Sequence, residues 1–266
     1  MNRIISLVVT FSLALIPVLA QAANRAETTI LPQRLVLEQG DRFVSLIVKN
    51  SGTATGQYTT EIIDMDMNED GTITPAEADK PRGSFSAIPY VHLAPRSFTL
   101  APDAYQTVRA IVRRPEGMPA GEYRSHIRVR LVNDDVDATP PADNQKIIVK
   151  ANLVMIVPLI VRQGETSFAA SLSSPKIIPA PGGGRMLELY IERTGNRSAE
   201  GDLKVFQSQS GILKEIAAIN GLPVYHETAR RLVRIQLPAS AENGQLTIRY
   251  QRQSGEAIEV LAEAKL

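Results

Sequence analysis

Apolar and polar residues alternate clearly in the stretch from Lys146 to Gly164, the longest apolar run after the N-terminal segment. Successive side chains of a strand point to opposite faces. One face would carry Ile147, Val149, Ala151, Leu153, Met155 and Val157, and the other Lys146, Ile148, Lys150, Asn152, Val154 and Ile156. The second face is mixed at its start and apolar at its end. The pattern predicts a strand that enters a core at one end and leaves apolar side chains partly uncovered at the other.

Two interpretations of this strand follow from its apolar character. An uncovered, β-branched strand tends to aggregate, so the protein either covers it as an ordinary buried strand of a sandwich or uses it to pair with another chain. Lys146 and Lys150 lie on the mixed face, where charges oppose aggregation. Pro158 has no N–H, so we expect regular pairing to weaken near it.

The rest of the chain reads as short strands between turns. In the first half the expected strands fall within residues 30–40, 41–52, 56–67, 91–93, 97–100, 106–112 and 122–132. In the second half they fall within residues 169–178, 186–193, 202–209, 212–219, 231–237, 245–251 and 257–262. The first half has no long apolar repeat of 3.6 residues, which predicts an all-β class. Turn signals at short, regular spacing favour an immunoglobulin-like sandwich.

The N-terminal segment has the pattern of a secretory signal peptide. A basic residue, Arg3, precedes an apolar run that ends at Leu19, and Ala20-Gln21-Ala22 fits a cleavage site. The pattern predicts a signal peptide over residues 1–22 and an exported protein, most simply one of a bacterial periplasm. A membrane anchor is the alternative, but Pro17 and the small residues after the run favour cleavage. No second run approaches the ~20 apolar residues that a membrane span needs.

Composition narrows the function classes. The chain has no cysteine, which removes disulfides and thiolate chemistry. Its net charge is +1 with both signs interspersed, whereas a nucleic-acid surface needs clustered basic residues. We therefore expect neither a nucleic-acid partner nor insertion into a membrane.

One stretch matches the pattern of a calcium-binding loop. Asp66, Asn68, Asp70, Thr72 and Glu77 occupy ligand positions, and Gly71 stands where the loop turns. The flanking helices of such loops are not predicted here, because a strand precedes the pattern and prolines follow it. A polar hairpin that turns at residues 68–71 is the favoured interpretation, and calcium binding remains open.

The sequence contains no recognisable catalytic set. The three histidines, His92, His126 and His226, are far apart and show no metal-ligand spacing. Glu61, Asp64 and Asp66 form a carboxylate cluster, but such clusters before a turn are usually solvated. We expect no enzymatic activity, no catalytic residue and no cofactor.

A series of motifs between residues 30 and 162 resembles one protein family. The motifs are R-x-V-x-x-x-G (Arg34, Val36, Gly40), a strand ending in Lys49-Asn50, the segment from Pro95 to Arg109, G-E-Y-R-S-H from Gly121 to His126, and the long apolar strand ending at Arg162. Their order resembles the PapD-like periplasmic chaperones of chaperone–usher pilus systems, with this chain as a divergent member. The resemblance implies two immunoglobulin-like β-sandwich domains set at an angle, here residues 23–163 and 164–266.

The resemblance also implies a function and a binding site. Such chaperones lend the last strand of the first domain to an incomplete pilus or fimbrial subunit, whose open core takes up the alternate apolar side chains. In this chain the lent strand would run from Lys146 to Val157, with Val149, Ala151 and Leu153 on the donated face. Arg34 would bind the C-terminal carboxylate of the subunit, for which a guanidinium is well suited.

This chain departs from the family at Pro158, where the family has a lysine that joins the arginine. Lys150 and Arg162 are the nearest cationic residues on the strand. Either Lys150 serves from a shifted position, or this chain does not hold subunit termini in the usual way. The implied partners are an exported pilus or fimbrial-type subunit and an outer-membrane usher, with a self-capping dimer as a further possibility. The alternative function is a stand-alone periplasmic structural or adhesive module, stabilised by calcium.

Overall fold

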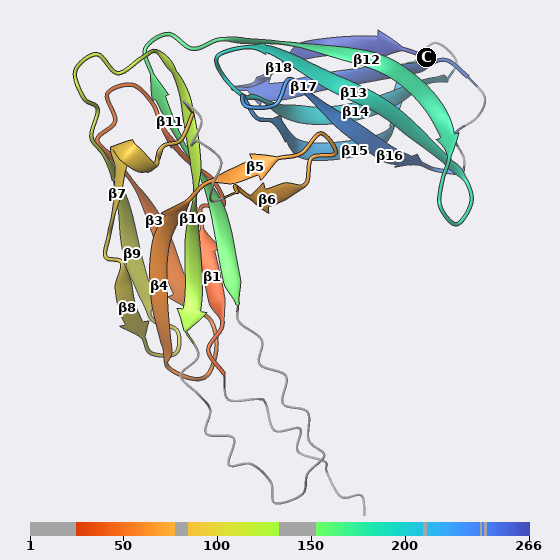
Figure 1. The fold of residues 1–266 in the computed structure, drawn as a ribbon. Coiled ribbons are helices and arrows are strands. Elements are labelled where there is room, and N and C mark those ends of the chain that lie inside the picture. The colour runs from red at the N-terminus through yellow and green to blue at the C-terminus, as the bar shows by residue number, and fades with distance from the viewer. Residues whose placement is uncertain (1–24, 78–84, 133–152, 210–211, 240, 242–243) are drawn as a thin grey trace, which may run out of the picture.

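The computed structural model describes residues 25–77, 85–132, 153–209, 212–239, 241 and 244–266. Within them the chain forms eighteen strands and one short 3-10 helix, η1 (Ile88–Tyr90). The predicted all-β class is therefore confirmed. The strands form two β-sandwiches set at an angle to one another (Figure 1). None of the helical segments described is long and apolar enough to cross a membrane.

The first sandwich consists of two antiparallel sheets with one parallel pair. One sheet has the order β1 (Thr28–Leu31), β3 (Phe43–Asn50), β9 (Tyr105–Val112) and β7 (Val91–Ala94). The other has the order β2 (Leu35–Leu37), β11 (Val154–Gln163), β10 (Gly121–Val132), β4 (Gly56–Ile63) and β8 (Ser97–Leu100). Alternate residues such as Leu46, Val108, Ile127 and Leu159 are fully buried between the sheets. Each contributes roughly 1.5–3 kcal/mol by leaving water.

The start of the chain passes from one sheet of this sandwich to the other. β1 pairs antiparallel with β3, whereas β2, three residues further on, pairs parallel with β11. Leu35 and Leu37 of β2 point into the core. Because side chains alternate, Arg34 and Val36 point to the opposite, outward face of the sheet. The crossing therefore places Arg34 on the face that looks toward the second sandwich.

The expected weakening of pairing at Pro158 is wrong. β11 pairs with β10 without a break, and Pro158 lies opposite His126. The amide of Leu131 donates to the carbonyl of Leu153 at 3.2 Å, which makes Leu131–Leu153 a hydrogen-bonded pair. Hydrogen-bonded and non-hydrogen-bonded pairs alternate along an antiparallel ladder, so His126–Pro158 is a non-hydrogen-bonded pair. A proline costs the ladder nothing there, because an N–H at that position would point away from β10.

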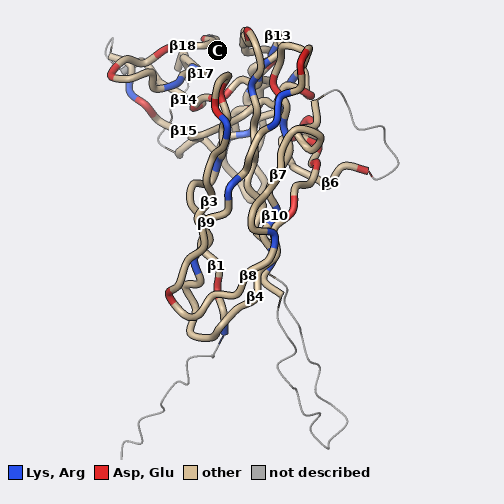
Figure 2. The backbone as a smooth tube through the Cα atoms, turned by 90° about the vertical axis from the view of Figure 1, so that its left-hand side faces the viewer, with Lys and Arg blue, Asp and Glu red and all other residues tan. Residues whose placement is uncertain are grey.

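The second sandwich has its own core. One sheet has the order β12 (Phe168–Pro179), β13 (Arg185–Gly195) and β16 (Arg230–Leu237). The other has the order β15 (Ile212–Val224), β14 (Ala199–Gln209), β17 (Leu246–Ser254) and β18 (Ala257–Lys265). Leu187, Leu203, Ile248 and Tyr250 are fully buried between these sheets. Acidic and basic residues are interleaved along both sandwiches (Figure 2).

A hairpin of β5 (Met65–Met67) and β6 (Ile73–Pro75) extends from the first sandwich to the second (Figure 1). At its tip the carbonyl of Glu69 accepts a hydrogen bond from the amide of Leu232 at 2.6 Å. Thr228 Oγ1 donates to the carbonyl of Met67 at 3.0 Å, and Glu69 forms an ion pair with Arg230. The hairpin therefore links the two sandwiches at a second place, away from the chain connection between β11 and β12.

Candidate functional site

β11 has an open edge along half of its length. β10 pairs with all ten residues of β11 on one side, but on the other side β2 reaches only Leu159, Ile160 and Val161. Among the strands described, none lies beside residues 154–158 on that side. Since Leu131–Leu153 is a hydrogen-bonded pair, Val154 and Ile156 direct their N–H and C=O groups to the open edge. An unpaired row of this kind is a template for another strand.

The side chains at this edge are apolar and solvent-exposed. Leu153, Val154 and Ile156 are each 40 or 41% exposed. Val154 and Ile156 share one face, and Leu153 lies on the other face with Met155, which packs against the core, and Val157, which is buried. Of the predicted donated residues, Leu153 is therefore accessible, whereas Val149 and Ala151 lie outside the described residues, as does Lys150. The described part of the strand thus combines free backbone groups with uncovered apolar side chains.

Strand register brings several charged residues together on the outward face of the sheet. Leu35 pairs with Leu159, which places Arg34 level with Pro158 on one side. His126 pairs with Pro158 from the other side, and Arg124 pairs with Ile160. Pro158, which stands where the family has a lysine, thus lies between Arg34 on one side and Arg124 and His126 of β10 on the other.

Arg34 lies between the sandwiches and contacts the second one. One guanidinium nitrogen, Nη1, forms an ion pair with Glu200 of β14. The side chain is 21% exposed, yet Nε and Nη2 are buried and have no hydrogen-bond partner within the described part of the chain. Arg34 is therefore a partly buried cation with only part of its donor capacity in use.

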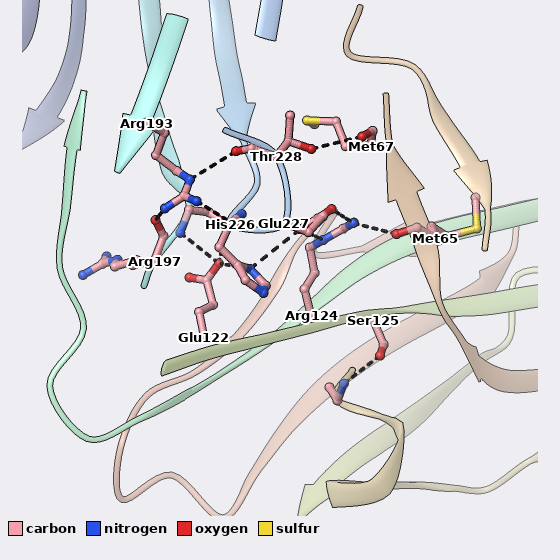
Figure 3. Close-up of polar contacts among 12 residues, drawn as sticks. Met65, Met67, Glu122, Arg124, Ser125, Arg193, Arg197, His226, Glu227 and Thr228 are labelled. Atoms are coloured by element: carbon pink, nitrogen blue, oxygen red, sulfur yellow. Dashed lines mark hydrogen bonds and ion pairs between the residues drawn. The ribbon is translucent and has the colours of Figure 1, made fainter. Parts of the chain in front are cut away.

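Arg124 is the second arginine of this region and is almost entirely buried. Its guanidinium stacks on the ring of Tyr225 at 4.0 Å, forms an ion pair with Glu227, and donates to the carbonyl of Met65 at 2.6 Å (Figure 3). Burial raises the pKa of Tyr225, while the charges of Arg124 and Arg34 both lower it. Both arginines therefore lie within electrostatic reach of the same phenol.

The neighbouring His126 is held in its neutral form. Its Nε2 lies 3.2 Å from Arg124 Nη1. Burial, and then the charge of Arg124, lower the pKa of His126 to about 3. A neutral imidazole accepts a hydrogen bond from the guanidinium, so His126 supports Arg124 without adding to the positive charge.

A buried polar network around Glu122 joins the sandwiches beside these arginines. Glu122 Oε2 accepts from Arg162 Nε at 3.0 Å, and Glu122 Oε1 accepts from the amide of Ser198 at 3.2 Å. His226 Nδ1 lies 3.5 Å from Glu122 Oε1 (Figure 3). Burial raises the pKa of Glu122, but His226, Ser198 and Arg162 outweigh it and lower the pKa to about 2. Arg162 also pairs with Glu38, so its charge is fully engaged.

The middle of the calcium-loop pattern forms the tip of the β5–β6 hairpin, while Asp66 lies within β5 and Glu77 follows β6. Asp70 Oδ1 accepts from the amide of Thr72 at 2.9 Å and from its hydroxyl at 2.6 Å. Asn68 Nδ2 donates to Thr72 Oγ1 at 3.0 Å. In the described part of the chain, no three His, Asp or Glu side chains gather as a possible metal site. The loop therefore closes through its own hydrogen bonds, and Asp66 and Glu77 are not drawn into a cluster with Asp70.

Sequence patterns identified Arg34 but not the charged residues that surround it. Glu122, Arg124 and His126 alternate with Tyr123, Ser125 and Ile127 along β10, so a period of two already puts the three on one face. That alternation was the available signal. Ser198 and Glu227, the partners of Glu122 and Arg124, and Glu200, the partner of Arg34, are more than 70 residues away in sequence and carry no local signature.

Comparison with known proteins gives similarities in structure only. No protein-family model matches the sequence, and no curated protein matches it either. The structure is similar to the YadV chaperone, with 10% identity, a TM-score of 0.49 and coverage of 90% of this chain and 99% of the other. It is similar to the Escherichia coli chaperone DraB, with 17% identity, a TM-score of 0.47 and coverage of 91% and 97%.

A third similar structure contains a bound partner. It is the CsuC–CsuE complex of a chaperone with a tip adhesion subunit, from the archaic chaperone–usher Csu pili of Acinetobacter baumannii. Identity is 12%, the TM-score is 0.47, and the match covers 90% of this chain and 98% of the other. All three matches have low sequence identity and TM-scores below 0.5.

Proposed function

We propose that the protein is a periplasmic, non-enzymatic chaperone that holds an exported pilus or fimbrial-type subunit by lending it the strand from Lys146 to Val157. The observation that carries this proposal is the open edge of β11. Free N–H and C=O groups of Val154 and Ile156 lie beside the exposed side chains of Leu153, Val154 and Ile156. A subunit that lacks one strand has the complementary features, namely an unpaired strand edge and an uncovered hydrophobic core.

The charged residues beside this edge suit the carboxylate at the end of such a subunit. Arg34 has buried, unused guanidinium donors and lies level with the end of the open edge. We infer that Arg124, on the neighbouring strand, supplies the second positive charge that Pro158 does not provide, through its field and not by direct contact, because Glu227 and the carbonyl of Met65 already bind its guanidinium. Arg162 is a poor candidate because Glu122 and Glu38 both bind it. Lys150 remains a candidate from its place in the sequence.

The location and the further partners belong to the same proposal. A cleaved signal peptide over residues 1–22 would bring the chain to the periplasm, where incomplete subunits need protection before assembly. Release of the subunit would then require an outer-membrane usher as acceptor. Before a subunit is captured, pairing of two β11 edges in a self-capping dimer would protect the exposed strand.

The test is capture of the subunit in the periplasm of the protein's own host. The tagged mature chain is compared with Leu153→Asp at the open edge and with Ile47→Asp, whose side chain is equally exposed on the other sheet (41% against 40%). We expect a stoichiometric small β-rich protein with the wild type and with Ile47→Asp, but not with Leu153→Asp. Circular dichroism checks that all three are folded.

Two results would contradict the proposal. An empty capture with all three folded forms would favour a stand-alone β-sandwich module. Loss of folding in Leu153→Asp alone would identify Leu153 as a core residue, and the equally exposed Ile156→Asp then decides whether the edge binds.

A further inference from the structure

Arg34 is already occupied by a carboxylate of the same chain. Glu200, the second residue of β14, reaches across from the second sandwich and pairs with Nη1 of Arg34. The side chain of Glu200 is 43% exposed, about twice as much as that of Arg34. Both residues interact electrostatically with the buried Tyr225 and Tyr250, so the pair lies over the end of the second sandwich that faces the first.

The pair leaves Arg34 incompletely satisfied. A guanidinium offers five N–H donors in a planar fork, and a carboxylate satisfies it best by two parallel hydrogen bonds. Here Glu200 uses Nη1, while Nε and Nη2 are buried and have no acceptor within the residues described. Buried donors without acceptors are costly. A second arrangement, in which a carboxylate engages the fork from its unused side, would be more favourable for Arg34.

We propose that Glu200 is an internal competitor that closes the carboxylate-binding site of Arg34 until a partner's C-terminal carboxylate displaces it. This inference rests on the proposed function, because it presupposes a partner that ends at Arg34. In the free protein Glu200 neutralises a cation that would otherwise be buried and unpaired. In the complex the partner's carboxylate takes over that neutralisation, and Glu200, already half exposed, turns to solvent.

Displacement of Glu200 need not separate the sandwiches. The Glu122 network, the Arg124–Glu227 pair and the β5–β6 hairpin each join them independently of Arg34. Glu200 therefore sets how strongly a terminal carboxylate must bind in order to be retained. An internal chain segment or an amidated C-terminus has no terminal carboxylate charge and would not displace Glu200. Glu200 is in this sense a residue that determines specificity for a free chain terminus.

The test uses one synthetic strand peptide with alternating valine and threonine residues, prepared with a free C-terminal carboxylate and with a C-terminal amide. Binding of both forms to the full mature chain is measured by calorimetry for the wild type, Glu200→Gln, Arg34→Ala and Glu215→Gln. Glu215 is the matched control, because it pairs with Lys204 in the same sheet and its side chain is equally exposed (43%).

We expect Glu200→Gln to strengthen binding of the carboxylate peptide by about three- to tenfold, as for removal of a competing, partly exposed ion pair. The amide peptide should be unaffected by Glu200→Gln, and Glu215→Gln should behave as wild type. Arg34→Ala should remove the preference for the carboxylate peptide.

The outcomes separate this inference from the proposed function. A preference for the carboxylate that depends on Arg34 but is unchanged in Glu200→Gln would overturn the competitor role and leave the proposed function intact. Equal strengthening of both peptides would also overturn it, because Glu200 would then only restrict access. If neither peptide binds to any form of the protein, both the competitor role of Glu200 and the proposed function are contradicted.

Discussion

The charged residues between the two sandwiches differ in how well they are satisfied. Glu122 receives hydrogen bonds from Arg162 and Ser198, which is the arrangement that makes a buried carboxylate tolerable. Arg34, which also lies between the sandwiches, pairs through one nitrogen only. A fully satisfied buried ion is a structural element, whereas a partly satisfied one has capacity for a ligand. On this difference rests our proposal that Arg34 binds a ligand, while Glu122 joins the two sandwiches.

The low pKa of Glu122 predicts how stability depends on pH. Its pKa in the folded protein is about 2, below the usual 4.5. The unfolded chain therefore binds a proton that the folded chain does not, and ionised Glu122 stabilises the fold above pH 4.5. This contribution, about 3 kcal/mol at most, is lost as the pH falls from 4.5 to about 2. We expect Glu122→Gln to be less stable at pH 7 and to have a flatter stability curve over this range.

Urea denaturation at a series of pH values measures this effect. Glu215→Gln is the control, because its ion pair with Lys204 is partly exposed and should leave the acid slope unchanged. An acid slope in Glu122→Gln equal to that of the wild type would show that other groups cause the loss of stability in acid. His126, whose folded pKa of about 3 lies below the usual 6.5, acts in the same direction, so the wild-type slope should begin near pH 6.5.

Among the elements, β11 shows what sequence patterns reveal and what they miss. Its alternation and apolar end predicted a strand that is buried at one end and uncovered at the other. Ile160 and Val161 are fully buried, whereas Leu153 and Val154 at the other end are each 40% exposed. The effect of Pro158 was predicted wrongly, because it depends on which pairs of the β10–β11 ladder are hydrogen-bonded. That register is fixed by two strands together and is not contained in either one alone.

The same register predicts opposite effects for two prolines in β11. In Ile156→Pro the missing N–H would have pointed to the open edge, as at Pro158, so we expect a stability loss of about 1 kcal/mol or less and loss of subunit capture. In Met155→Pro the missing N–H belongs to the ladder with Val129. It leaves a buried carbonyl unpaired, and we expect a loss of about 2 kcal/mol or more.

Chemical denaturation together with the capture assay distinguishes the two variants. The prediction for the open edge fails if Ile156→Pro captures the subunit as well as the wild type does. It fails equally if both prolines destabilise the fold by the same amount, because the derived direction of the N–H groups would then be incorrect.

At the scale of the whole molecule, the link between the sandwiches was the least predictable part. The hairpin tip was identified from its Asn68, Asp70 and Gly71 pattern, but nothing near it in sequence indicates that it contacts Thr228, Arg230 and Leu232. These contacts join residues about 160 positions apart. Two sandwiches that each bury their own core need no further contact to be stable, so their relative placement depends on a few polar contacts that no periodic pattern encodes.

These contacts predict that the hairpin restricts the angle between the sandwiches. In the double variant Glu69→Ala and Thr228→Val, the ion pair with Arg230 and the hydrogen bond to Met67 are lost, while both cores are untouched. We expect residual dipolar couplings of the wild type to fit a single alignment tensor for both sandwiches. In the double variant we expect two tensors of different magnitude, with little change in the unfolding temperature of either sandwich.

Glu263→Ala is the control for this experiment, because it removes an ion pair with Arg249 within the second sandwich and should leave the single tensor intact. If the double variant also keeps a single tensor, the Glu122 network and the Arg124–Glu227 pair are sufficient to fix the angle. If it does not, the hairpin is needed to hold the second sandwich, and with it Glu200, in place beside Arg34. The β5–β6 hairpin and Glu200 would then act on the same step, because a looser hairpin makes Glu200 a weaker competitor for Arg34.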